Sequence, residues 1–154
     1  RASDAGIIFV AAAANEGKNN DSQDMYPANV QAANVITVAA SDSSDAKPSW
    51  SNYGKDKVHV AAPGHNIYST IPNNKYQNLS GTSMATPLVA GLVALLKSQS
   101  AAVNIDADGA ALKAILQKTG AQVDIETACG CRVDAKAALD HLTSNTLTVV
   151  PSAI

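Results

Sequence analysis

One heptad constrains the fold of this 154-residue chain more than any other segment: residues 81–87, with the sequence GTSMATP. It opens an apolar stretch that predicts a buried helix from Ser83 to about Lys97. A serine in the first turn of a helix lies beside free N–H groups and at the positive end of the helix dipole, which favours developing negative charge. Gly81 and Ala85 are small enough to let a second backbone come close.

Ser83 has two possible roles in this position. A serine at a helix start most often caps the helix by accepting a hydrogen bond from a backbone N–H. Alternatively, its hydroxyl is the nucleophile of an acyl transfer, which also needs a base to take its proton and donors for the oxyanion. The complete heptad favours the second role, because a capping serine would not require its neighbours.

The heptad, followed by LVAG at 88–91, resembles the nucleophile motif of the subtilisin-like serine proteases (subtilases). Residues 6–17 (GIIFVAAAANEG) are similar to the oxyanion strand of that family. Residues 49–54 (SWSNYG) and 58–64 (VHVAAPG) resemble its loop and strand before the nucleophile, and all segments occur in the family's order. The resemblance covers most of residues 6–140. It implies the subtilisin-like fold, an α/β arrangement with a mostly parallel sheet flanked by helices.

The resemblance implies two catalytic residues, Ser83 as the nucleophile and Asn15 as an oxyanion donor. The carboxamide of Asn15 would act together with the backbone N–H of Ser83. Asn15 follows a strand, and α/β sheets place ligands at the carboxyl ends of their strands. The alternative is an asparagine that only forms a turn before Glu16.

The family's substrate pocket maps onto residues near Asn15. By resemblance, three alanines would line it with their backbone, Glu16 would lie at its rim and Met25 near its floor; the alanines are Ala12, Ala13 and Ala14. Ala14 stands where the family commonly has glycine, and Met25 stands where a smaller residue is usual. Both departures narrow the pocket and predict small or medium apolar residues at the cleaved position. Met25 could instead point into the core.

The catalytic aspartate and histidine of the family have no counterpart in this sequence. In subtilases they lie in short glycine-containing motifs upstream of the oxyanion strand, in the order Asp, His, Ser. We therefore expect residues 1–142 to be the C-terminal half of a catalytic domain, followed by a tail at 143–154. His59, His65 and His141 are expected to be a core or edge histidine, a solvated turn residue and a surface residue, respectively.

Apolar runs and turn residues predict the other elements. Buried strands are expected at 6–14, 35–40 and 58–62, the first of them central and covered on both faces. A hairpin is expected from 67–71 and 76–80, and helices are expected at 83–97, 106–119 and 134–142. Gly120 would cap the second of these helices.

Composition excludes several classes of protein. The 46% apolar content is that of a globular domain, and a net charge of −2 gives no reason to expect nucleic acid or an anionic membrane as a partner. No apolar run is long enough to span a bilayer. Cys129 and Cys131 could form a small disulfide loop or pair outside the chain, and the family resemblance favours a secreted protein.

The resemblance to subtilases implies a serine endopeptidase that cleaves proteins through an acyl-enzyme. Its expected partners are the N-terminal portion carrying Asp and His, a protein or peptide substrate, and a possible inhibitory propeptide. No catalytic cofactor or metal is expected, although structural calcium could bind upstream residues. The loop carboxylates Asp42, Asp45 and Asp56 are expected to be solvated. The alternative is a catalytically inactive subtilase-like binding module.

Overall fold

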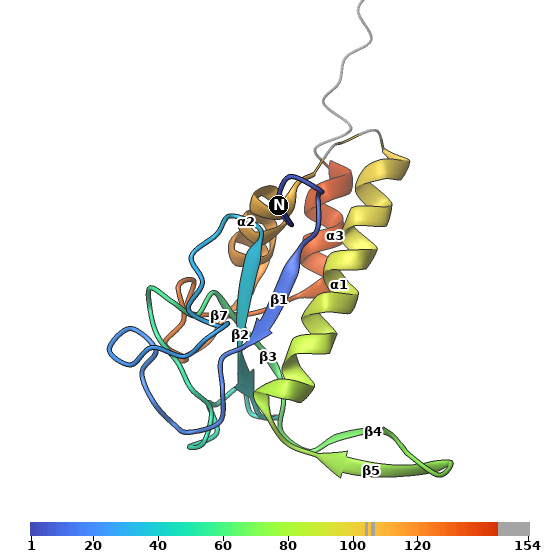
Figure 1. Cartoon of the computed structure of the whole chain (residues 1–154). Coiled ribbons are helices and arrows are strands. Elements are labelled where there is room, and N and C mark those ends of the chain that lie inside the picture. The colour runs from blue at the N-terminus through green and yellow to red at the C-terminus, as the bar shows by residue number, and fades with distance from the viewer. Residues whose placement is uncertain (104, 106, 145–154) are drawn as a thin grey trace, which may run out of the picture.

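A computed structural model describes residues 1–103, 105 and 107–144 of the chain (Figure 1). Its helices are α1 (Thr82–Ala102), α2 (Gly109–Thr119) and α3 (Ala135–Ser144). Its strands are β1 (Phe9–Ala12), β2 (Val35–Ser41), β3 (Val60–Pro63), β4 (Ile67–Ile71), β5 (Lys75–Leu79), β6 (Ala121–Gln122) and β7 (Cys131–Arg132).

The main sheet has the strand order β1-β2-β3-β7-β6. The first four strands are parallel to one another, and only β6 at the far edge is antiparallel. Every residue of β2 is buried, as expected for a continuous apolar strand inside a parallel sheet. The α/β class with a mostly parallel sheet is therefore confirmed.

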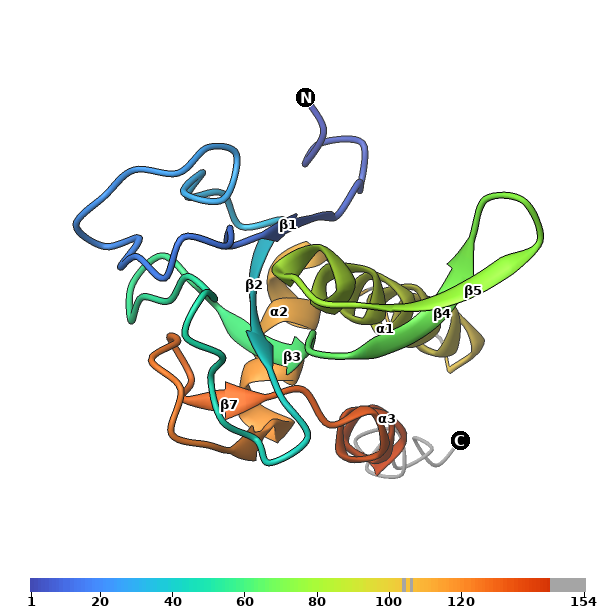
Figure 2. The ribbon, with the colours of Figure 1, turned by 90° about the horizontal axis from the view of Figure 1, so that it is seen from below.

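The two faces of the sheet are covered differently. Side chains such as Val38 and Val60 pack with residues of all three helices in one core cluster. On the opposite face, Ala39 and Ala61 pack against loop residues in a second, smaller cluster. Figure 2 shows the helices gathered on one side of the strands and loops on the other. Alternate residues of β2 and β3 thus serve two different layers.

Strand β1 differs from the prediction of a central strand covered on both faces. It pairs only with β2 and forms an edge of the sheet. Ile7 and Phe9 are 54% and 45% exposed. The N–H groups of Phe9 and Ala13 donate toward β2, so the alternate residues Val10 and Ala12 direct their N–H groups to the open edge.

Helix α1 is likewise buried on one face only, whereas the sequence predicted burial all round. Its buried residues recur at helical spacing, with Val89, Leu92 and Leu96 facing the sheet. Beside this buried stripe, on an adjoining side of the helix, Leu88 and Leu95 are 46% and 50% exposed. A helix that is apolar on all sides needs cover on two sides, and the described residues supply it on one.

The predicted hairpin is confirmed. Strands β4 and β5 pair antiparallel, with Ile67 opposite Leu79. Asn73 and Asn74 form the turn with positive φ values of 68° and 54°, a conformation that asparagine tolerates. Both strands are largely exposed, and the hairpin projects away from the body of the molecule (Figures 1 and 2).

Helix α2 starts later than expected and ends at the expected cap, Gly120. It begins at Gly109, where the side chain of Asp108 caps it by accepting from the Ala111 N–H at 2.8 Å. The N–H of Gly120 donates to the Leu116 carbonyl at 3.1 Å, although its φ of −62° is not left-handed. In addition, a Cβ at Gly120 would lie only 2.6 Å from the Sγ of Cys131. This glycine is needed for close packing.

The last helix and the tail only partly match their predicted ranges. Helix α3 continues to Ser144, so Thr143 and Ser144, expected in the tail, are helical. The remaining tail residues, 145–154, lie outside the described residues.

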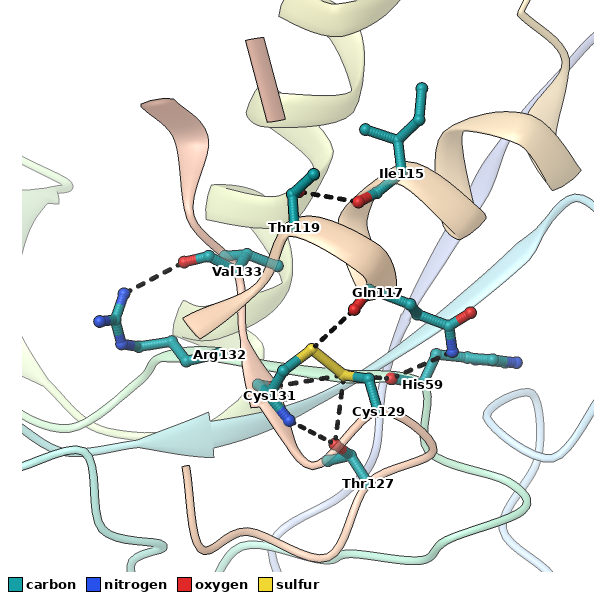
Figure 3. Close-up of a disulfide and its surroundings, with 9 residues drawn as sticks. All are labelled: His59, Ile115, Gln117, Thr119, Thr127, Cys129, Cys131, Arg132 and Val133. Carbon is teal, nitrogen blue, oxygen red and sulfur yellow. Dashed lines mark hydrogen bonds between the residues drawn. A yellow bond between two sulfur atoms is a disulfide. The ribbon is translucent and has the colours of Figure 1, made fainter. Parts of the chain in front are cut away.

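Cys129 and Cys131 form a disulfide with each other, which settles the alternatives left open by the sequence (Figure 3). The sulfur of Cys129 lies 3.3 Å from the carbonyl oxygen of His59. The N–H of Cys131 donates to the Thr127 hydroxyl at 3.4 Å. The small loop thus holds β7 against the segment that leads into β3.

Candidate active site

The first turn of α1 lies at the carboxyl ends of β2 and β3. The N–H of Gly81 donates to the Gly64 carbonyl at 2.8 Å, directly after β3. A Cβ on Gly64 would lie 2.7 Å from the Cβ of Ala40 and 2.8 Å from the Gly81 carbonyl oxygen. Glycine at position 64 therefore allows the helix start to approach the sheet edge, where α/β folds bind ligands. Figure 2 views this end of the strands.

Ser83 is the second residue of α1 and is exposed. The N-cap is Gly81, and no side chain caps the helix, so the interpretation of Ser83 as a capping residue is wrong. Within the described residues, the Ser83 N–H has no hydrogen-bond acceptor. Pro87 lacks the N–H that would have bonded the Ser83 carbonyl one turn back. The serine thus carries a free N–H at the positive end of the helix.

The side chain of Asn15 is oriented by Thr82. Its Oδ1 accepts hydrogen bonds from the Thr82 N–H at 2.8 Å and from the Thr82 hydroxyl at 2.9 Å. Because the Thr82 N–H can only donate, the amide oxygen must face Thr82, and the Nδ2 donors point elsewhere. Asn15 is therefore tied to the helix start by its side chain, which a simple turn-forming residue would not be.

The Asn15 amide and the Ser83 N–H flank the same small space. A methyl group placed on Gly81 would lie 3.5 Å from both the Asn15 Nδ2 and the Ser83 nitrogen. Gly81 has no side chain to fill this space, so both donors can reach one acceptor there. Two preorganised N–H donors that converge on one point are what an oxyanion requires. This is the arrangement expected for an acyl-transfer site.

Ala14 adopts an unusual conformation next to Asn15. Its φ is 93°, in the region that favours glycine, which gives a physical reason why a glycine would suit this position. Its N–H donates to the Thr82 hydroxyl at 3.3 Å, and its carbonyl accepts from the Asn52 N–H at 3.0 Å. The peptide groups on both sides of Ala14 are thus held in place.

The other expected pocket residues have varied surroundings. Ala12 is the half-buried last residue of β1. The Ala13 side chain is fully buried in the smaller core cluster, and its N–H and carbonyl already bond Val38 and Asn20. Glu16 is exposed and pairs with Lys18 at 2.7 Å. Ala13 therefore anchors the end of β1 with all of its polar groups in use.

Met25 lies directly before the cis Tyr26–Pro27 peptide bond and is half-buried. It belongs to neither core cluster, so the alternative that it packs in the core is not supported. Its carbonyl accepts from the Asn29 N–H at 2.7 Å, which fixes the backbone of this loop.

An open cleft of about 280 Å³ lies beside Ser83. The hairpin forms one wall and the first turns of α1 form the other. Its lining is mainly apolar and consists of Ile67, Ser69, Thr70, Leu79, Ser83, Met84, Pro87 and Leu88. Ser83 thus lies on the wall of a groove rather than on a flat surface.

His59 and His65 have partners other than Ser83. His59 is 7% exposed, and its Nδ1 accepts from the Thr37 N–H at 2.8 Å. Burial, and to a lesser extent the nearby positive charge of Lys113, lower its pKa from 6.5 to about 4. His59 is therefore a neutral, satisfied core histidine, as expected. His65 is exposed and lies edge-on to Trp50.

The depressed pKa of His59 predicts a loss of stability in mild acid. The unfolded chain takes up a proton near pH 6.5, whereas the folded protein does so only near pH 4. The stability present above pH 6.5 is lost as the pH falls through this window, by up to about 3 kcal/mol. Urea unfolding at several pH values should show a shallower loss for His59→Gln than for the wild type. Equal slopes would contradict this assignment.

Two of the three loop carboxylates, those of Asp42 and Asp45, accept hydrogen bonds from other residues of the chain. Asp42 accepts from the N–H groups of Ser44 and Ala46 at 2.8 and 3.0 Å. Asp45, expected to be solvated, instead forms a two-pronged ion pair with Arg132. In the described part of the chain, no group of three or more His, Cys, Asp or Glu side chains is placed to hold a metal ion.

Two residues with a clear part in this geometry were missed by the sequence analysis. Thr82 lies inside the heptad but received no role, although it directs the Asn15 amide. Asn52 lies inside the SWSNYG segment and contacts the residues on both sides of Asn15. The only signal in the sequence was their presence in segments quoted for another reason.

The chain is similar in sequence to known proteins of one family. A sequence profile described as the Subtilase family matches residues 1–145. Thermitase from Thermoactinomyces vulgaris is 52% identical over 94 residues, which are 61% of this chain and 32% of that protein. Subtilisin-like protease 2 from Plasmodium falciparum (isolate 3D7) is 45% identical over 93 residues, or 60% of this chain and 7% of that protein.

Solved structures show the same fold. The prenylagaramide maturation protease PagA matches with a TM-score of 0.77 and 28% identity over 92% of this chain and 52% of that one. The patellamide maturation protease PatA matches with a TM-score of 0.77 and 29% identity over 93% of this chain and 54% of that one. The chain therefore spans about half the length of these structures, and it belongs to the subtilase family.

Proposed function

We propose that this chain is the nucleophile-bearing part of a serine endopeptidase that hydrolyses peptide bonds in proteins. The observation that supports this most directly is the convergence of the Asn15 Nδ2 and the Ser83 N–H on the space above Gly81. Ser83 lies beside this space, at the start of an uncapped helix. Family membership supports the reaction class, and this geometry supports the proposed roles of Ser83 and Asn15.

In the proposed reaction, the Oγ of Ser83 attacks the carbonyl carbon of the scissile peptide and its proton passes to a histidine. The carbonyl oxygen becomes an oxyanion that accepts hydrogen bonds from Asn15 and the Ser83 N–H. Collapse of this intermediate breaks the C–N bond, and the histidine protonates the leaving amine. Water then hydrolyses the acyl-enzyme by the same steps. Each stage uses the same two oxyanion donors.

The histidine and its aspartate partner are proposed to come from another part of the protease. His59 and His65 have other partners, and a serine without a base is a poor nucleophile. The open edge of β1 and the exposed apolar residues Phe9, Leu88 and Leu95 are features suited to covering by that part. Leu88 also lines the cleft beside Ser83.

The substrate class and location complete the proposal. Proteins or peptides with small or medium apolar residues at the cleaved position would suit a pocket narrowed by Ala14 and Met25, with Ala12, Ala13 and Glu16 around it. Secretion is supported by the Cys129–Cys131 disulfide, because disulfides persist in oxidising compartments. An inhibitory propeptide and calcium bound by upstream residues belong to the same proposal.

In the described part of the chain, no helix is both long enough and apolar enough to cross a bilayer.

The test combines this chain with the part that supplies the aspartate and histidine and exposes the complex to a fluorophosphonate probe. We expect the probe on Ser83, identified by mass spectrometry of the labelled peptide. A chromogenic peptide series should then show faster cleavage after Ala or Leu than after Phe or Arg. An assembled but unlabelled complex would instead support the inactive binding module. Strong preference for Phe or Arg would refute only the narrow pocket.

A further inference from the structure

We propose that Asn52 is a positioning residue that sets the oxyanion donor Asn15 in place by holding the chain on both sides of it. The proposal rests on the proposed protease function and adds a residue to which nothing in the sequence analysis gave a role. We define the oxyanion loop as residues 13–18, between the end of β1 and Lys18.

The contacts of Asn52 bracket Asn15. The backbone N–H of Asn52 donates to the carbonyl of Ala14 at 3.0 Å. Its side-chain Oδ1 accepts from the Glu16 N–H at 2.8 Å and from the Lys18 N–H at 3.1 Å. The residues immediately before and after Asn15 are thus bound by one residue that lies 37 positions later in the chain.

These contacts also fix the orientation of the Asn52 amide. The two backbone N–H groups can only donate, so the atom facing them must be Oδ1 and the Nδ2 must point the other way. There it donates to the Oδ1 of Asn20 at 2.9 Å, and the Nδ2 of Asn20 donates to the Ala13 carbonyl at 3.1 Å. The donors and acceptors of this network are therefore assigned unambiguously, and it connects Asn52 through Asn20 to Ala13, the first residue of the oxyanion loop.

The asparagines of this network are buried, whereas most residues of the oxyanion loop are more exposed. Asn52 and Asn20 are fully or almost fully buried, whereas Asn15, Glu16 and Lys18 are exposed. The exposed residues have little packing of their own to define their position. Hydrogen bonds between buried polar groups are stronger in the low local dielectric, and they are costly to leave unmade. Asn52, which is itself held in the protein interior, thus fixes the position of the exposed donor Asn15.

Position matters here because an oxyanion donor acts only at hydrogen-bond distance from the developing charge. A misplacement of about 1 Å at a reacting centre can cost about 100-fold in rate. Thr82 holds the side-chain oxygen of Asn15 from the helix. Asn52 holds the two peptide groups of the Asn15 backbone. Both the side chain and the backbone of Asn15 are therefore held, by residues from different segments of the chain.

The experiment uses the complete protease with the substitution Asn52→Ala. This change leaves the Glu16 and Lys18 N–H groups and the Asn20 oxygen without their partners but keeps the Asn52 backbone. We expect kcat to fall by about 10- to 100-fold with little change in KM. Affinity for a peptide boronate, which forms a tetrahedral adduct with the serine, should fall with kcat. A merely structural role would not separate kcat from KM in this way.

A double-mutant cycle tests whether Asn52 acts through Asn15. In the Asn15→Ala background, adding Asn52→Ala should lower kcat by less than twofold, because the donor that it positions is already gone. The matched control is Asn34→Ala. Asn34 is also a buried asparagine, and its Nδ2 donates to the Ile7 carbonyl at 2.8 Å, at the other end of β1. This variant should keep the wild-type kcat.

The outcomes separate the two proposals. If the wild-type complex neither turns over substrate nor labels Ser83, the protease function fails. If the wild type is active but Asn52→Ala keeps its kcat, or if its effect multiplies with that of Asn15→Ala, the positioning role fails. An equal loss of kcat in Asn34→Ala would mean that general destabilisation explains the effect of Asn52→Ala. That result would also overturn the positioning role of Asn52.

Discussion

Replacing Ser83 with alanine in the complete protease is expected to abolish peptide hydrolysis. Without the hydroxyl no acyl-enzyme can form, so the covalent route is lost rather than slowed. In subtilisin, a member of the same family, removal of the nucleophile lowers kcat by about 2 × 10⁶-fold. Hydrolysis of a chromogenic peptide should therefore fall to the level that the two oxyanion donors alone support. Labelling by a fluorophosphonate should disappear with it.

The matched control for this experiment is Ser98→Ala. Ser98 is also an exposed serine on α1, but it lies about four turns beyond Ser83. Its replacement should leave both turnover and labelling intact. Substantial turnover in the Ser83→Ala variant, with Ser98→Ala unaffected, would show that another group is the nucleophile.

The elements that the sequence predicted well are those defined by local patterns. Strand β2 is a run of apolar residues, and the hairpin is marked by the Pro72–Asn74 turn. The start of α1 follows from the heptad. In each case the deciding information lies within about ten neighbouring residues. The pattern of hydrophobic and turn residues is sufficient for such elements.

The exposed surfaces could not be predicted in the same way. The apolar pattern of β1 and α1 correctly indicates elements that can be buried on two sides, but burial depends on what covers them. In the described residues, Phe9 and Leu95 have no such cover. The prediction and the structure therefore differ at residues that are apolar but exposed. One exposed apolar residue of α1, Leu88, also lines the cleft beside Ser83.

The sequence predicted the two residues of the candidate site but not the residues that orient them. Ser83 and Asn15 were chosen because their chemistry suits an oxyanion site. The contacts that orient Asn15 come from Thr82, 67 positions later, and from Asn52. Such contacts depend on the sheet topology, which places the carboxyl ends of the parallel strands β1, β2 and β3 at one edge of the sheet. A single sequence carries no local sign of them.

Replacing Asn15 with alanine is expected to lower kcat by about 100- to 1000-fold while KM changes little. This magnitude is the one measured for loss of the equivalent kind of donor in subtilisin. The oxyanion develops only after attack, so the lost hydrogen bond stabilises the transition state rather than the bound substrate. Steady-state kinetics of the complete protease would measure the split. A rise in KM at constant kcat would instead assign Asn15 to substrate binding.

The substitution Asn15→Asp separates donation from positioning. Aspartate has the same shape, and one carboxylate oxygen can still accept from the N–H and hydroxyl of Thr82. The other oxygen would replace the Nδ2 donor with negative charge beside the developing oxyanion. We therefore expect a loss of kcat at least as large as in Asn15→Ala, although the loop geometry is retained. If Asn15→Asp kept most of the activity, Asn15 would act by holding Thr82 in place and the oxyanion would depend on the Ser83 N–H.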